Sequence, residues 1–406
     1  MIKVELLKSK RNLILSILLG ILVFFIPLSS ALTNIMLIPA GIFFLVYYSP
    51  KEWFSNFPKP IKIFFFSIGL MWILSIFKGS FLLDINIYSR YLVVILVCLL
   101  SSKIQKEIVI ENFYLSSLIL VTCISTFKIV EKKMENPDLL FDNGLFIDQV
   151  LWESRPLAAF MLVLGIFICL RRISIKSKPN LLFIFLAVCL LFFCNYISAR
   201  LSLMLAIILI FYFTFFKFQI SKKTKLILLT SLFIGLPIML LFNKSLIERT
   251  PFNREFEFEK IYDIARDREP RYVIWNCVAI LLTNQSNFYF GISSYEQYRQ
   301  DLVKCYEETI VNREEKKAYY MESRFNSHNQ FLDFWLNGGL IPFLLLLLLY
   351  ITVFFSKKMP STAKLMYLLF FCFFLFENVL YRQMGCYLFG IFATLYLYRS
   401  SEKTIK

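Results

Sequence analysis

His328 is the only histidine in this chain of 406 residues. It lies in the segment Asn326–Phe331, where a long polar stretch runs into an apolar one. A neutral imidazole can take a proton from an attacking hydroxyl at physiological pH, so His328 is the first candidate for chemistry. The same position also suits a purely structural polar residue at a membrane interface, and the rest of the chain has to decide between the two.

Two arginines are the candidates for binding an anion. Arg200 follows the short polar connection 195–199, and Arg271 follows Pro270. The planar guanidinium group binds phosphate oxygens in pairs and stays charged at any working pH. Two fixed cations and one proton acceptor on the same face of a membrane would suit the transfer of a group that is activated by phosphate.

Composition identifies the elements that must position these residues. The chain is 58% hydrophobic and contains 46 Phe, and its mean hydropathy is +0.66. Soluble globular proteins carry fewer apolar residues, and no strand-like alternation long enough for a barrel is visible, so we predict an all-α polytopic membrane protein. Its apolar runs are long enough for about twelve transmembrane helices, near residues 12–28, 30–48, 61–77, 87–101, 108–130, 156–170, 181–197, 201–216, 226–243, 331–355, 365–381 and 384–398.

The distribution of positive charge predicts the topology. Lys and Arg gather in every second connection, beginning with the segment 1–11, as is typical of cytoplasmic loops. Both termini are therefore expected in the cytoplasm. Most of the net charge of +16 lies in these predicted cytoplasmic loops, so we attribute it to the topology. No nucleic-acid partner is expected.

One long outside segment divides the chain into three parts. Spanning helices are predicted in 1–243, a periplasmic loop in 244–330, and further spanning helices with a cytoplasmic tail in 331–406. The loop holds 13 basic and 14 acidic residues. Residues 271–282 have apolar positions at helical spacing after Pro270, which predicts an amphipathic helix in a helical cap.

Other polar features of the outside face leave alternatives open. The acidic and aromatic residues alternate in 255–259, which could bind a metal but favours a solvated face. Cys277 and Cys305 both fall in the outside loop and could pair in an oxidising compartment. Glu377 and Arg382 flank the outer end of the eleventh apolar run, where they could form a structural salt bridge or mark a functional path.

At these positions the chain resembles the O-antigen ligase (WaaL) family and the related O-antigen polymerases (Wzy-type), which share a membrane domain. The segments that carry the resemblance are 197–202, 271–275, 327–332 and 337–340. Ala199, before Arg200, departs from the polar residue of many relatives. The resemblance implies a GT-C-like membrane fold in a bacterial inner (cytoplasmic) membrane, with the active site facing the periplasm.

The resemblance also implies an activity: metal-independent, inverting glycosyl transfer without a cofactor. The donor would be a glycan on undecaprenyl diphosphate, and the acceptor a sugar of the lipid A core in lipopolysaccharide biosynthesis. Arg200 and Arg271 would hold the diphosphate, and His328 would activate or orient the acceptor hydroxyl. Further residues are expected to bind substrate, namely Asn329, Arg382, Glu377 and Arg155.

Absences in the sequence agree with a lipid-linked donor. The chain has no Asp-x-Asp triplet, no glycine-rich phosphate loop and no soluble α/β domain of the kind that binds nucleotide sugars. A polymerase would differ from a ligase only in its acceptor, a second lipid-linked glycan, and the spacing of the three residues looks more like that of a ligase. A transporter or flippase would place charges or broken helices near the bilayer midplane, whereas the charges here gather at outer ends.

Overall fold

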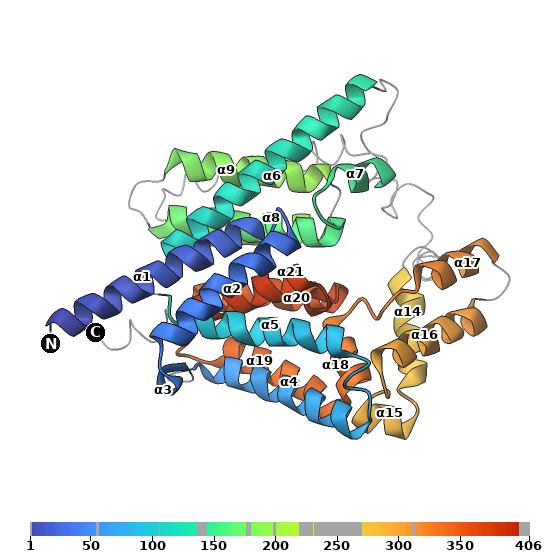
Figure 1. Cartoon of the computed structure of the whole chain (residues 1–406). Helices are drawn as coiled ribbons and strands as arrows, with labels where there is room; N and C mark the ends of the chain where they lie inside the picture. The colour runs from blue at the N-terminus through green and yellow to red at the C-terminus, as the bar shows by residue number, and fades with distance from the viewer. Residues whose placement is uncertain are drawn as a thin grey trace. The chain divides into compact units, whose positions relative to one another are not determined.

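A computed structural model describes residues 2–53, 57–104, 106–135, 144–175, 180–197, 200–218, 230, 270–310 and 314–397. Every regular element among these residues is a helix, so the predicted all-α class is confirmed for them (Figure 1). Within the described ranges, five helices are long and apolar enough to cross a membrane: Ser30–Tyr47, Lys59–Phe77, Glu107–Glu135, Arg155–Ile175 and Arg200–Lys217. Five shorter apolar helices accompany them. The chain therefore has the character of a helical membrane protein.

The first eight predicted apolar runs each fall on a helix, although the first helix begins at Ile2, ten residues before the predicted start at 12. These helices are α1 (Ile2–Phe25), α2 (Ser30–Tyr47), α4 (Lys59–Phe77), α5 (Ile85–Ser101), α6 (Glu107–Glu135), α8 (Arg155–Ile175), α9 (Leu181–Tyr196) and α10 (Arg200–Tyr212), which continues as a π-helical turn, Phe213–Lys217. Two short helices, α3 (Pro50–Trp53) and α7 (Gly144–Val150), lie between them. The ninth run, 226–243, lies outside the described residues, and the count of twelve spanning helices stays a prediction.

The tenth run, 331–355, differs from the prediction because it is two helices. Helix α18 (Gln330–Gly338) has nine residues, and α19 (Leu340–Phe355) starts afresh after Gly339. Gly339 has a φ of +78°, and a Cβ there would lie 2.2 Å from the carbonyl oxygen of Tyr289. The break lets another backbone pack directly against this point. Only α19 is left as a candidate for spanning the membrane, and α18 precedes it.

The eleventh run also ends earlier than predicted. Helix α20 (Ser361–Phe376) stops where Glu377 takes an extended conformation. The chain then forms a short 3₁₀ helix, Val379–Tyr381, before α21 (Gln383–Leu388) and the π-helical turn Phe389–Ala393. The turn between α20 and α21 therefore carries Glu377 in irregular backbone.

The chain divides into two compact units. Unit 1 contains the described residues of Met1–Leu15, Ile38–Gln105 and Phe258–Lys406, and unit 2 those of Ser16–Leu37 and Lys106–Glu257. In unit 2, α8 is buried along nearly its whole length and packs on α6, α9 and α10. A Cβ on Gly165 of α8 would meet the side chains of Leu118 and Leu190, which shows how closely the three helices approach.

In unit 1, α4 packs along α19, and α5 packs against α4 and α21 (Figure 1). The hydroxyl of Ser67 donates to the carbonyl of Pro342 at 3.0 Å, which joins α4 to the first turn of α19. These helices support the short helices at the end of the bundle, where α18 contacts α19 and α20.

The described part of the predicted outside loop forms a helical cap, defined here as α14 (Pro270–Leu281), α15 (Gln285–Phe290), α16 (Tyr295–Thr309) and α17 (Glu314–Ser323). The prediction of a helix at 271–282 is confirmed by α14. Side chains cap two of these helices, because Asn284 accepts from the first turn of α15 and Ser294 from that of α16. The cap belongs to unit 1, together with helices that precede and follow it in the sequence.

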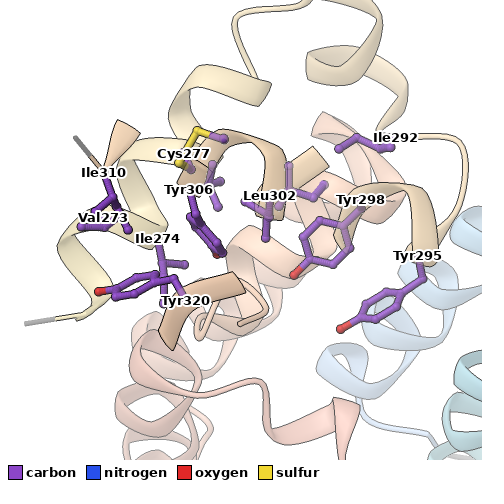
Figure 2. Packing of buried hydrophobic residues seen from close by; sticks show 13 residues of the cluster. Val273, Ile274, Cys277, Ile292, Tyr295, Tyr298, Leu302, Tyr306, Ile310 and Tyr320 are labelled. Carbon is purple, nitrogen blue, oxygen red and sulfur yellow. A yellow bond between two sulfur atoms is a disulfide. The ribbon is translucent and has the colours of Figure 1, made fainter. Parts of the chain in front are cut away.

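A buried core and one disulfide hold the cap together. Cys277 of α14 and Cys305 of α16 are joined, with their Cα atoms 5.7 Å apart, which resolves the alternative that the sequence left open (Figure 2). Large buried side chains belong to the same core as the bridge, among them Tyr306 and Tyr298 of α16 and Tyr320 of α17. The bridge fixes α14, which carries Arg271, against α16.

Two residues of the α4–α5 connection attach the cap to the bundle of unit 1. The Lys78 ammonium donates to the carbonyls of Ile292 at 3.0 Å and Asn337 at 3.2 Å, and burial lowers its pKa to about 8. Both carboxylate oxygens of Asp84 accept from the backbone N–H of Tyr295 at 3.0 Å. The cap is thus hydrogen-bonded to the loop between two apolar helices.

Candidate functional site

His328 occupies a turn with an unusual backbone. Its φ of 44° lies in the left-handed region, which non-glycine residues seldom adopt, although His, Asn and Asp are the most tolerant. The side chain of Asn326 stabilises the turn by accepting from the backbone N–H of His328 at 3.1 Å. Asn329 then caps α18. Strained backbone of this kind tends to gather at functional sites.

The imidazole of His328 contacts a carboxylate from a distant segment. Its Nδ1 lies 3.4 Å from Oε2 of Glu377, and its ring lies 5.5 Å from that of Phe325. The His328 side chain is 26% exposed and that of Glu377 15%. A carboxylate at Nδ1 favours the tautomer with the proton on that nitrogen and leaves Nε2 as the basic nitrogen.

Arg271 reaches the other oxygen of the same carboxylate. Its Nη2 lies 3.3 Å from Oε1 of Glu377, and its Nε donates to the carbonyl of Phe376 at 3.3 Å. The guanidinium also lies 5.8 Å from the centre of the Phe376 ring. The Arg271 side chain remains 29% exposed, so part of this cation faces outward.

Glu377 therefore joins the two candidates that the sequence placed far apart. One carboxylate holds an imidazole and a guanidinium through its two oxygens, and all three groups are partly exposed. Such a cluster can accept a proton at Nε2 and stabilise negative charge at the guanidinium. The structure brings His328 and Arg271 to the same carboxylate, and Glu377 is the residue that links them.

Arg200 and Arg155 lie in unit 2. Arg200 is the first residue of α10, and Arg155 the first of α8. Arg155 forms a two-point ion pair with Asp148, at 3.0 Å and 3.1 Å. The two units are described separately, so the grouping of Arg200 with Arg271 and His328 stays a prediction, as does a role for Arg155 in binding substrate.

Asn329 and Arg382 have structural contacts in unit 1. The Asn329 side-chain oxygen accepts from the N–H groups of Phe331 and Leu332, and its Nδ2 donates to the carbonyl of Leu375 at 3.1 Å. These bonds engage both ends of the amide, so the structure gives Asn329 a capping role. Arg382 is exposed and directly precedes α21, where its carbonyl accepts from the N–H of Cys386. Binding of substrate by either residue stays a prediction.

A buried polar cluster next to the site is absent from the sequence predictions. It consists of Ser327, Asn378, Asp333 and Tyr298, all buried. Asp333 had a visible signal, because it is the only charged residue in the apolar run 331–355. Its burial raises the pKa of the carboxyl from its usual 3.8 to about 7, while the hydrogen bond from Tyr298 opposes that shift.

No group of three or more His, Cys, Asp or Glu side chains that could hold a metal is found among the described residues. The acidic stretch 255–259 lies outside them. No protein-family model matches the sequence, and no curated protein matches it either.

Proposed function

We propose that this protein is an O-antigen ligase, which transfers a glycan from undecaprenyl diphosphate to the lipid A core at the periplasmic side of a bacterial inner membrane. The observation that carries the proposal is that Glu377 contacts both His328 and Arg271. It supports the two roles that the family resemblance implies, a proton acceptor and an anion-binding cation within reach of one another.

The chemistry assigns each group one task in a single displacement. The acceptor hydroxyl attacks the anomeric carbon of the donor sugar and gives its proton to Nε2 of His328. The bond from that carbon to the diphosphate oxygen breaks, and the leaving diphosphate takes the electron pair. Arg271 stabilises the charge that develops on it, while Glu377 stabilises the imidazolium and keeps both side chains in place.

The disulfide supports the proposed location of the site. Disulfides persist in oxidising compartments and are rare in the reducing cytoplasm. The Cys277–Cys305 bridge lies in the same cap as Arg271, so it favours a cap that faces the periplasm. The other seven cysteines are free, and all lie in helices outside the cap.

The proposal is tested with the purified full-length protein in lipid nanodiscs. The donor is undecaprenyl-diphosphate-linked glycan, offered in EDTA with either lipid A core or a second lipid-linked glycan as acceptor. Glycan on the lipid A core supports a ligase. Lengthening of the lipid-linked glycan instead identifies a polymerase, and transfer to neither acceptor contradicts both activities.

A substitution at Arg271 tests the role of the cation. Arg271→Ala is expected to slow transfer by roughly 10²- to 10³-fold, because a preorganised charge at the leaving group is lost. Arg271→Lys keeps the positive charge but loses the paired N–H donors of the guanidinium group, so an intermediate rate is expected. Arg299→Ala, on α16 of the same cap, serves as the matched control. An unchanged rate in Arg271→Ala would remove the diphosphate-binding role.

A further inference from the structure

A buried polar cluster lies next to the His328–Glu377 pair in the sequence and in the structure. Ser327 and Tyr298 are completely buried, and Asp333 is 1% and Asn378 4% exposed. Burying a polar group is costly unless it is hydrogen-bonded, and apolar side chains of similar size would fill the same space at less cost. Filling space does not by itself explain these polar side chains. Their hydrogen bonds, which have defined directions, suggest that they fix the positions of their neighbours.

Asp333 and Asn378 are the centre of its hydrogen bonds. Nδ2 of Asn378 donates to Oδ1 of Asp333 and to Oγ of Ser327, both at 3.1 Å. The hydroxyl of Tyr298 accepts from the backbone N–H of Ser327 at 2.8 Å and donates to Oδ1 of Asp333 at 3.4 Å. One buried carboxyl thus connects α16, α18 and the turn after α20.

Each residue of the candidate site is a near neighbour of this cluster. Ser327 directly precedes His328, and Asn378 directly follows Glu377. The indole N–H of Trp275, one helical turn after Arg271, donates to the carbonyl of Ser327 at 3.0 Å. The three segments that present the imidazole, the carboxylate and the guanidinium therefore meet at Ser327.

We infer that Asp333 and Asn378 are positioning residues. They hold the turn of His328 and the turn of Glu377 in the relative position that brings Nδ1 of His328 to the Glu377 carboxylate. The inference deepens the proposed function and rests on it only where transfer is measured. Asn378 joins the two turns through its amide, and Asp333 fixes that amide by accepting its N–H. Both side chains are buried, so neither is placed to touch a substrate.

The single histidine allows a direct measurement of the contact between Nδ1 of His328 and the Glu377 carboxylate. His328 is the one histidine of the sequence, so the protein is prepared without a histidine tag and labelled with ¹⁵N in histidine only. Its spectrum then contains a single pair of ring nitrogen signals, both from His328. The position of the Nδ1 signal reports whether the carboxylate of Glu377 is in contact. Glu377→Gln gives the reference position for a lost carboxylate.

Two variants disturb the cluster without touching the pair itself. Asn378→Ala removes the bridge between the turns, and Tyr298→Phe removes one hydroxyl with almost no change in volume. Both are expected to move the Nδ1 signal toward that of Glu377→Gln. Asp333→Asn keeps an acceptor oxygen and is expected to stay nearer the parent signal than Asp333→Leu.

Asn12→Ala is the matched control. Asn12 is a buried amide on α1, and its Oδ1 accepts a hydrogen bond of 2.7 Å from the hydroxyl of Tyr48. It is expected to leave the imidazole signal unchanged. The inference is overturned if folded Asn378→Ala and Tyr298→Phe both give the parent signal. If Asn378→Ala does not fold, Tyr298→Phe alone decides.

The rate of glycan transfer is the second measurement. Asn378→Ala is expected to be roughly 10- to 100-fold slower than Asn12→Ala, since misplaced reacting groups lose rates of this order. A rate equal to that of the control also overturns the inference. If the parent protein itself transfers no glycan, the proposed function fails, and the imidazole signals still determine whether the cluster positions His328.

Discussion

At the scale of single residues, His328 combines a strained backbone with a defined partner for its ring. Its φ of 44° is left-handed, and its Nδ1 lies 3.4 Å from a carboxylate oxygen of Glu377. The observed pair therefore favours a functional role for the imidazole.

Replacement of His328 can separate the imidazole from the turn. His328→Asn is expected to fold, because Asn tolerates the left-handed region, and to slow transfer by about 10²- to 10⁴-fold through loss of the proton acceptor. Arg324→Gly is the matched control, since Arg324 also has a φ of 44°. It relieves the same kind of strain and is expected to transfer normally. A His328→Asn rate within about threefold of the parent excludes a proton-transfer role.

Asp333 predicts a pH dependence of stability. Its folded pKa of about 7 is above the usual 3.8, so the folded state holds a proton between these values that the unfolded state has released. The stability contributed by that proton is complete below about pH 4 and is lost as the pH rises to about 7, at no more than about 1.4 kcal/mol per pH unit.

Thermal unfolding of the full chain between pH 4 and 8 tests this dependence. The side chain at position 333 of the Asp333→Asn variant cannot titrate. The melting temperature of this variant is therefore expected to rise relative to that of the parent as the pH increases. A constant difference between the two midpoints across this range would show that Asp333 does not titrate there.

At the scale of elements, the site depends on where helices end. Asn329, directly after His328, is the N-cap of helix α18, and α20 ends just before Glu377. The disulfide holds α14 on α16, and the break at Gly339 lets α15 pack against the junction of α18 and α19. Each helix end is thus a backbone position that presents or supports a side chain of the site.

A Cβ at Gly339 is expected to disturb this junction. Gly339→Ala requires a left-handed Ala and places its Cβ 2.2 Å from the carbonyl oxygen of Tyr289, so we expect a loss of about 2–4 kcal/mol. Gly41→Ala, in helix α2 with open space around its Cβ, is the control and is expected to be neutral or slightly stabilising. Equal melting temperatures for the two variants would contradict the packing of α15 at this point.

At the scale of the whole molecule, the proposed topology is the property to test. The cap is expected outside, and the Lys-containing turn between α19 and α20 inside, because positive residues gather in cytoplasmic loops. Alkaline phosphatase inserted at Asn284, in the exposed turn before α15, is expected to be active in bacterial cells. The same insertion after Lys358 is expected to be inactive. The reverse result would place the candidate site in the cytoplasm.

The sequence by itself determined the helical class and most helix positions, and it named all three residues of the candidate site, although it gave Glu377 a role in binding substrate and not the role of linking the other two. These are local properties, because apolar run length and a Pro before an amphipathic pattern depend only on neighbouring residues. His328 and Arg271 were recognisable for the same reason, since their chemistry belongs to the side chain alone.

Only the tertiary structure decided which residues meet. Glu377 pairs with residues 106 and 49 positions away, and nothing in its local sequence distinguishes these partners from Arg382. The disulfide, the capping role of Asn329 and the buried contacts of Asp333 were decided in the same way. The break at Gly339 also required the backbone of α15 to be in place. Such contacts depend on how helices distant in the sequence pack, and local patterns carry no information about that packing.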